Sequence, residues 1–246
     1  MSYRYLLLFP LLLPATSLAA ESEPSPWLTE IELGYQSLSG NSDSSAFNTR
    51  MAASYTKGRI KNTAESKYLL AEKDGKEDKR KFQLNAQSNY KYDEKRYVLA
   101  SGSYVDDRYG PYFSDIVVAT GLGYQAIRKR QLQLTLELGP GYRRQRPNLD
   151  ELDSDDKILP YDVDEIIVRG QMNVEWRPRK NVTVDLTLTG IAGNSNSTIE
   201  ADTSLTASIS DTLAVKISNT QNYSTDVPPG LKNRDSVMTV NLLYKF

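Results

Sequence analysis

The sequence has 246 residues, with 30 Lys and Arg against 31 Asp and Glu, and it contains neither Cys nor His. Without Cys there is no disulfide framework and no lipoprotein attachment site, and without His the usual base for acyl or peptide hydrolysis is missing. The mean hydropathy of −0.52 does not exclude a membrane protein built from β-strands, because only every second residue of such a strand faces lipid.

Residues 1–20 predict a secretory signal peptide. Arg4 precedes the apolar run Leu6–Leu13, and small residues follow at Ala19 and Ala20. The run is about half as long as the roughly 18 apolar residues that a membrane anchor needs. We therefore expect residues 21–246 to form the mature domain.

From Trp27 onward, apolar and polar residues alternate with the period of two that is typical of β-strands. The first strand places Ile31 and Leu33 on one face and Glu30 and Glu32 on the other. The pattern is strongest in 132–138 and 166–176 and weakest in 63–72. In chain order, the predicted strands cover about 27–36, 47–55, 63–72, 82–92, 96–106, 115–126, 132–138, 166–176, 182–188, 199–209, a segment from 213, and 237–246.

The connections after the even-numbered strands are short, and most of the others are longer, as in outer-membrane barrels. The chain also has 16 Tyr against 5 Phe, and a Tyr ring suits a membrane interface because it has one apolar and one wet end. Phe47 and Tyr55 lie at opposite ends of one strand, roughly 20 Å apart across a tilted barrel wall. A soluble barrel would instead need an apolar interior.

These observations predict an all-β fold, a transmembrane antiparallel up-and-down β-barrel of about 12 strands. We expect it in the bacterial outer membrane, with periplasmic termini and extracellular long loops. Outer-membrane lipid, including lipopolysaccharide, would surround it. We expect a monomer with no metal, no cofactor and no nucleic-acid partner.

The polar faces of the strands would line the lumen. Acidic and basic residues nearly cancel there, which argues against a channel for acidic oligosaccharides and favours paired charges bridging a narrow interior. The charged residues that we expect to line the lumen are Glu30, Glu32, Arg50, Glu65, Lys67, Lys81, Arg96, Glu137, Arg143, Arg169, Glu175, Asp185, Glu200 and Asp202.

One wall of the lumen would consist of small residues, and glycine in a strand often marks a close backbone approach. The longest connection, about Gln145 to Asp164, leaves from the top of this wall. Two explanations are open: the loop folds inward and narrows the mouth, or the small residues serve barrel curvature alone. The predicted wall comprises Ala100, Gly102, Ala119, Gly121, Gly123, Gly139 and Gly141.

The last segment ends on an aromatic residue at the end of an alternating strand. Val240, Leu242, Tyr244 and Phe246 share one face. The segment resembles the C-terminal strand by which bacterial outer-membrane barrels are recognised for assembly. We therefore expect Tyr244 and Phe246 to form an assembly signal read by the barrel assembly machinery.

Four short motifs carry a wider resemblance: LSGNS at 38–42, GLGY at 121–124, ELGPGYR at 137–143 and the final YKF. With these the chain resembles the salt-induced outer-membrane protein family, a domain of unknown function. The resemblance covers nearly the whole mature chain. It implies an outer-membrane location and supplies no catalytic residues.

Three functions are compatible with the sequence. The first is a narrow or gated pore for small solutes or ions, linked to salt or envelope stress. The second is a closed barrel with a structural or surface-interaction role through its acidic loops. The third and most remote is an outer-membrane hydrolase using Ser54 and Lys57, which match S-x-x-K but have opposite strand parity. We expect no catalytic residues.

Overall fold

The computed structural model describes residues 25–38, 44–110, 112–148, 161–226 and 233–246. The predicted signal peptide and most of the longest connection lie outside these ranges. Within them, no helix is long and apolar enough to cross a membrane.

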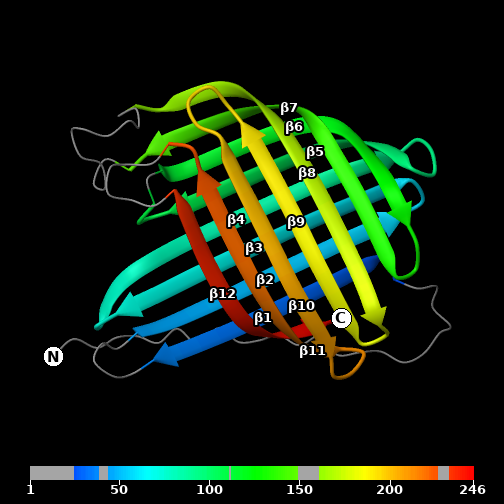
Figure 1. Ribbon diagram of the computed structural model, residues 1–246, viewed down its shortest axis with the longest axis horizontal. Helices are drawn as coiled ribbons and strands as arrows, with labels where there is room; N and C mark the ends of the chain where they lie inside the picture. Colours follow the sequence, from blue (N-terminus) through cyan, green and yellow to red (C-terminus); the bar gives the residue numbers. More distant parts are fainter. Residues whose placement is uncertain (1–24, 39–43, 111, 149–160, 227–232) are drawn as a thin grey trace.

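The described residues form one closed antiparallel barrel of twelve strands, each paired with its neighbours in the sequence, with β1 closing on β12 (Figure 1). This confirms the predicted fold class and strand number. The strands are β1 (Trp27–Leu38), β2 (Ser44–Lys57), β3 (Ile60–Lys73), β4 (Lys76–Lys91), β5 (Arg96–Asp107), β6 (Tyr112–Arg128), β7 (Leu132–Pro147), β8 (Val163–Arg179), β9 (Val182–Ala192), β10 (Thr198–Ser208), β11 (Leu213–Ser224) and β12 (Arg234–Lys245).

The outer wall is apolar because alternate residues of each strand point away from the lumen. Leu138, Met238 and Val240, for example, expose 64%, 63% and 58% of their surface on this wall. Leu243 has the opposite parity and is buried inside. An exposed apolar band around a closed sheet is what a bilayer requires, since the closed sheet leaves no unpaired strand edge in lipid.

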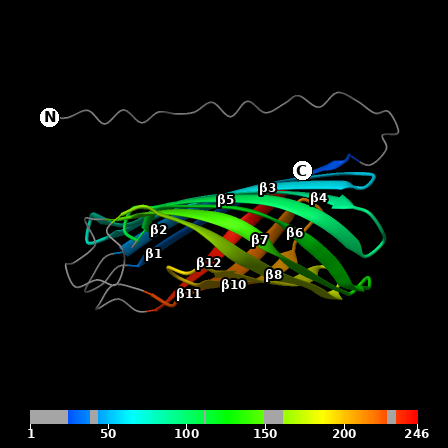
Figure 2. The same ribbon diagram turned by 90° about the horizontal axis from the view of Figure 1, so that it is seen from above.

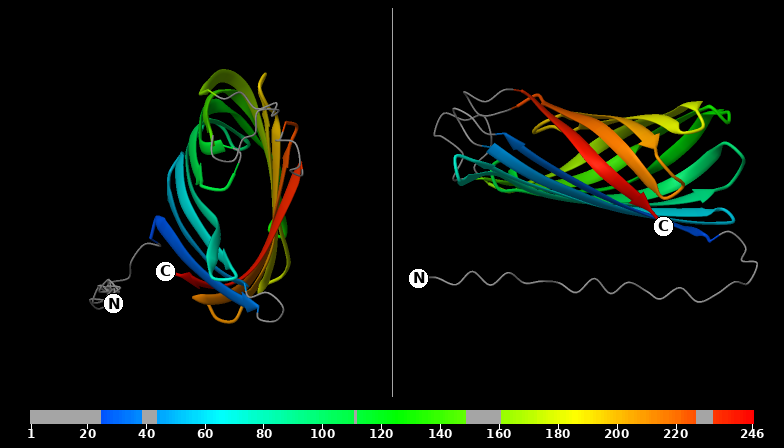
Figure 3. Two further views of the ribbon diagram at one scale, coloured as in Figure 1. Left: turned by 90° about the vertical axis from the view of Figure 1, so that its left-hand side faces the viewer. Right: turned by 90° about the horizontal axis from the view of Figure 1, so that it is seen from below.

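The barrel is flattened, with an elongated cross-section (Figures 2 and 3). Short turns join the strands at one end, and we call this the turn end; the longer connections lie at the loop end. Flattening brings opposite walls close enough for side chains to meet across the lumen.

Close backbone contact between β6 and β7 requires glycine. A Cβ on Gly139 would overlap the carbonyl oxygen of Thr120, and a Cβ on Gly121 would come within 3.0 Å of the Cα of Gly139. Pro140 has no N–H to donate to the ladder between these two strands. The two glycines therefore allow β6 and β7 to approach closely, which is compatible with both explanations of the small-residue wall.

The seam between β1 and β12 is short. Paired residues run from Glu30 to Leu33 on β1, whereas β1 pairs with β2 along its whole length. Two further backbone hydrogen bonds of 3.0 Å join Thr29 and Phe246 in both directions. The last residue of the chain therefore helps to close the barrel.

Candidate functional site: the lumen

The lumen contains all but one of the charged residues predicted to line it. The register places these side chains on the inner face of their strands. They are Glu30, Glu32, Arg50, Glu65, Lys67, Lys81, Glu137, Arg143, Arg169, Glu175, Asp185, Glu200 and Asp202.

The prediction for β5 is wrong by one residue. Tyr97 and Leu99 are buried on the lumen side, so Arg96, Ala100 and Gly102 point outward. The error arose because β5 has apolar residues on both faces. Tyr97 turns inward because its hydroxyl donates a 2.6 Å hydrogen bond to a buried carboxylate oxygen of Glu137.

Arg96 lies at the turn end, outside the lumen. Its Nε is 2.6 Å from Oδ2 of Asp93, and its guanidinium lies 5.5 Å from the ring centroid of Tyr92. Hydrogen bonds from the backbone N–H of Lys95 and then of Arg96 hold the pKa of Asp93 below its ordinary value. Arg96 thus stabilises a turn.

The first charge network joins β1, β2 and β3 to β11. The Arg50 guanidinium lies 2.6 Å from Glu32, 2.5 Å from Glu65 and 3.2 Å from Glu30. Lys216 reaches the same oxygen of Glu32 at 2.9 Å. The Glu32 side chain is 2% exposed, and a carboxylate so enclosed is stable only with partners of this kind.

One ion pair crosses the lumen. Nζ of Lys67 on β3 lies 3.3 Å from Oδ2 of Asp202 on β10. Four strands, β2, β1, β12 and β11, separate β3 from β10 on the shorter way round the barrel. Lys67 also lies 3.4 Å from Glu65, so this bridge continues the first network across the barrel.

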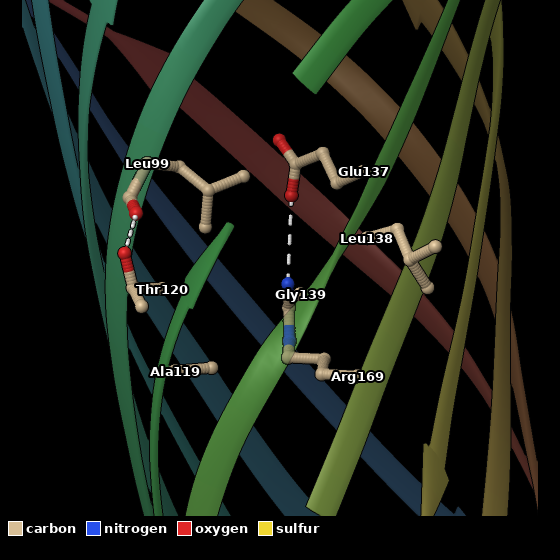
Figure 4. A pocket seen from close by; sticks show the side chains of 7 residues that line it. All are labelled: Leu99, Ala119, Thr120, Glu137, Leu138, Gly139 and Arg169. Atoms are coloured by element: carbon tan, nitrogen blue, oxygen red, sulfur yellow. Dashed lines mark hydrogen bonds and ion pairs between the residues drawn. The ribbon is translucent and has the colours of Figure 1, made fainter. Parts of the chain in front are cut away.

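A second network occupies the β4–β8 side. Oε1 of Glu137 accepts hydrogen bonds from Tyr97 at 2.6 Å and from Gln87 at 2.9 Å, and Oε2 lies 3.5 Å from Arg169. Beside it, a hollow lined by Leu99, Glu137 and Arg169 among others is too small for a water molecule (Figure 4).

The connection between β9 and β10 folds over the mouth at the loop end. Arg143, which is 0% exposed, forms an ion pair with Glu165 and donates a 2.6 Å hydrogen bond to the carbonyl oxygen of Asn196. Glu165 also accepts hydrogen bonds from the backbone N–H groups of Asn194 and Ser195, at 2.7 and 2.9 Å. We call Arg143, Glu165 and residues 193–197 the mouth latch.

The remaining small residues of the predicted wall, Ala119, Gly121, Gly123, Gly139 and Gly141, do line the lumen. A Cβ on Gly123 would overlap the ring of Tyr97, so this glycine makes room for that side chain. The prediction that the 145–164 connection folds inward concerns mainly residues 149–160, which lie outside the described residues. The mouth latch does fold inward at the loop end, and the sequence analysis did not predict it.

The remaining acidic residues lie along β8, β9 and β10. Gln133 donates a 3.2 Å hydrogen bond to Glu175, and Ser204 donates one of 3.4 Å to Asp185. Thr220 donates to Asp202, beside Glu200. Lys81 on β4 lies 3.3 Å from Asp107 on β5. Strands β8–β10 thus carry four of the eight predicted lumen carboxylates, Glu175, Asp185, Glu200 and Asp202, against Arg169 as their one predicted base.

In the described part of the chain, no group of three or more acidic residues is arranged to hold a metal ion. Ser54 and Lys57 point to opposite faces of β2, as their register with β3 shows, so they cannot act together on one substrate.

The family described as "Protein of unknown function, DUF481" matches residues 31–246. The chain belongs to this family. Because the function of the DUF481 family is itself unknown, membership adds no activity. No curated protein matches the chain.

Several solved barrels are similar in shape to this DUF481 protein. The KdgM porin is similar over 89% of this chain and 99% of that one, with 10% identity and a TM-score of 0.49. A NanC porin is similar over 88% of this chain and 97% of that one, with 10% identity and a TM-score of 0.49. The translocator domain of the autotransporter NalP from Neisseria meningitidis is similar over 92% of this chain and 90% of that one, with 9% identity and a TM-score of 0.45. At such low identity, these likenesses carry nothing about the lumen residues.

Proposed function

We propose that the protein is a monomeric, non-enzymatic outer-membrane pore for small ions and solutes, narrowed by charge networks and selective for cations. Its termini would be periplasmic and its loop end extracellular. The observation that carries the proposal is the Lys67–Asp202 bridge, with 3.3 Å between charged atoms of nearly opposite strands. Side chains that meet across a lumen leave room only for small solutes beside them.

The cation preference follows from the corrected orientation of β5. With Arg96 outside, the lumen loses one predicted base, and its β8–β10 wall carries four carboxylates, Glu175, Asp185, Glu200 and Asp202, against Arg169 as the one predicted base there. A pore lined by a surplus of carboxylates attracts cations and repels anions. This also disfavours acidic oligosaccharides as solutes.

A response to salt would follow from the exposure of the central bridge. The side chains of Lys67 and Asp202 are 34% and 28% exposed, so dissolved ions can screen their attraction. We infer that the bridge opens more often at high salt. Salt would then act directly on the pore, which agrees with the resemblance to salt-induced proteins.

The test is the current through the refolded protein in a planar bilayer, at 0.1 M and 1 M KCl, with a salt gradient to measure ion preference. We expect small steps, a reversal potential of the cation-selective sign, and a conductance that rises more steeply than that of the bulk solution. A reversal potential of the opposite sign would contradict the charge assignment.

A second candidate, a closed structural barrel, is favoured by the charge networks themselves, because Lys67 and Asp202 meet at 3.3 Å across the lumen. Silence at every salt concentration, from protein shown to be folded, would favour this candidate.

A further inference from the structure

The turns at the turn end carry a concentration of basic side chains. Every charged residue in the β6–β7 and β8–β9 turns is Lys or Arg, and the β2–β3 turn adds two more. The chain as a whole has a net charge of −1, so this end is unlike the rest of the molecule. We call the following six residues the basic turn surface: Lys57, Arg59, Lys129, Arg130, Arg179 and Lys180.

These six side chains are exposed and unpaired. All six are exposed to solvent, and within the described ranges no carboxylate is within ion-pair distance of any of them. The ion pairs that do form at this end involve neighbouring residues, Arg96 with Asp93 and Arg177 with Glu175. The other acidic residues of the turns are Glu94 and Asp211.

Basic residues at the loop end behave differently. Arg144 lies 2.8 Å from Asp162, and Arg80 and Arg108 lie 3.6 and 3.8 Å from Glu77. Lys73, Lys76 and Lys79 at the loop end are also exposed without an ion pair among the described residues, but there they share the surface with acidic residues such as Glu77 and Asp162. The basic turn surface differs in having no such acidic neighbours within ion-pair distance.

The aromatic residues beside the basic turn surface indicate its position along the membrane normal. Trp27 and Tyr55 contact each other on the outer wall, with ring centroids 5.0 Å apart, and Trp176 and Tyr244 are about half exposed on it. Such rings sit at the membrane–water interface. Lys57 follows Tyr55 by two residues and Arg179 follows Trp176 by three, which is roughly 10 Å at most along a strand.

Side chains at this height meet the phosphate layer of the leaflet that faces the turns. Exposed Lys and Arg beside a membrane attract acidic lipids, and each contributes separately. Because Arg and Lys have long stems, their charges can follow mobile head groups without a fixed pocket.

We propose that the basic turn surface binds the head groups of acidic phospholipids in the leaflet that faces the turns. This goes beyond the pore function and does not depend on it. Under the proposed topology that leaflet is the periplasmic one.

The test uses the full chain, refolded into vesicles of equimolar phosphatidylglycerol and phosphatidylcholine and then extracted with mild detergent. The ratio of the two lipids retained on the protein is measured by native mass spectrometry. The test variant carries Lys129→Gln, Arg130→Gln, Arg179→Gln and Lys180→Gln. The control removes the same charge at the loop end through Lys76→Gln, Arg108→Gln, Arg144→Gln and Arg146→Gln.

We expect the wild-type protein and the control to retain phosphatidylglycerol preferentially, and the test variant to lose about fivefold or more of this preference. For the wild-type protein alone, 0.5 M NaCl should lower the preference, which keeps the proposal testable if the variant does not fold. No preference in the wild-type protein, or an equal fall in both variants, would overturn the proposal and leave the surface to an acidic soluble partner.

Discussion

At the scale of single residues, burial separates two neighbouring ion pairs of similar chemistry. Arg143 and Glu165 point inward and are almost fully buried, whereas Arg144 and Asp162 lie on the outer wall and are 52% and 34% exposed. Removing one partner of a buried pair leaves an uncompensated charge, which costs roughly 3–5 kcal/mol, while an exposed pair contributes roughly 0–1 kcal/mol.

Glu165→Ala should therefore lower the free energy of unfolding by about 3–5 kcal/mol in urea titrations in liposomes. It should also raise the single-channel conductance, because residues 193–197 lose the carboxylate that holds them over the mouth. Asp162→Ala is the matched control, with a change below about 1 kcal/mol and an unchanged conductance. Equal effects of the two substitutions would show that the latch is not a buried element of the mouth.

Leu186 and Thr187 on β9 test the register of the barrel. Leu186 points outward, and Thr187 points inward, where its hydroxyl donates a 3.1 Å hydrogen bond to Asn173. Leu186→Arg should destabilise the barrel in liposomes by about 2–4 kcal/mol, because arginine would face lipid near the midplane. Thr187→Arg should be mild, since it faces Asp202, and should weaken the cation preference. The reverse ranking would mean that β9 is shifted by one residue.

At the scale of strands, the sequence predicted elements whose outer face is consistently apolar. On most strands one face is clearly the more polar, but β5 carries Val98 on one face and Leu99 on the other and has few polar residues to mark its inner face, so its pattern cannot choose between them. The orientation of β5 is determined instead by Glu137 on β7, whose buried carboxylate accepts a hydrogen bond from the Tyr97 hydroxyl. A contact between distant strands is not visible in the alternation of one strand.

The mouth latch was missed for a related reason. The predicted strand began at residue 166, one residue too late to include Glu165, whose parity would have placed it inside. The partners of Glu165 lie in the β9–β10 connection, where no alternation exists to orient them. A Cβ at Gly193 would collide with the Glu165 carboxylate, but this contact becomes visible only once the structure brings the two residues together.

β12 offers a prediction about assembly. Phe246 follows it, is 63% exposed on the outer wall and joins Thr29 at the seam. Phe246→Ala should lower the amount of folded barrel recovered from outer membranes several-fold, because it removes the terminal aromatic of the proposed assembly signal. Ile209→Ala, which removes an equally exposed apolar side chain at the same end, is the control. Equal recovery of both variants would show that Phe246 is not part of the assembly signal.

At the scale of the whole molecule, flattening determines how the barrel can function. A circular barrel of twelve strands would hold opposite walls apart, whereas here Lys67 and Asp202 meet across the lumen at 3.3 Å. The composition alone indicated paired charges in a narrow interior. Which residues pair across it depends on the barrel cross-section, and strand alternation contains no information about that.

The most direct measurement is the conductance of the Lys67→Ala variant beside the wild-type protein. Lys61→Ala, an exposed residue of the same strand at the turn end, serves as the control. The narrow-pore account predicts larger current steps and a stronger cation preference for Lys67→Ala, because the bridge is lost and Asp202 is freed. It predicts wild-type steps for Lys61→Ala. Unchanged steps in Lys67→Ala, from protein shown to be folded, would contradict the claim that this bridge narrows the pore.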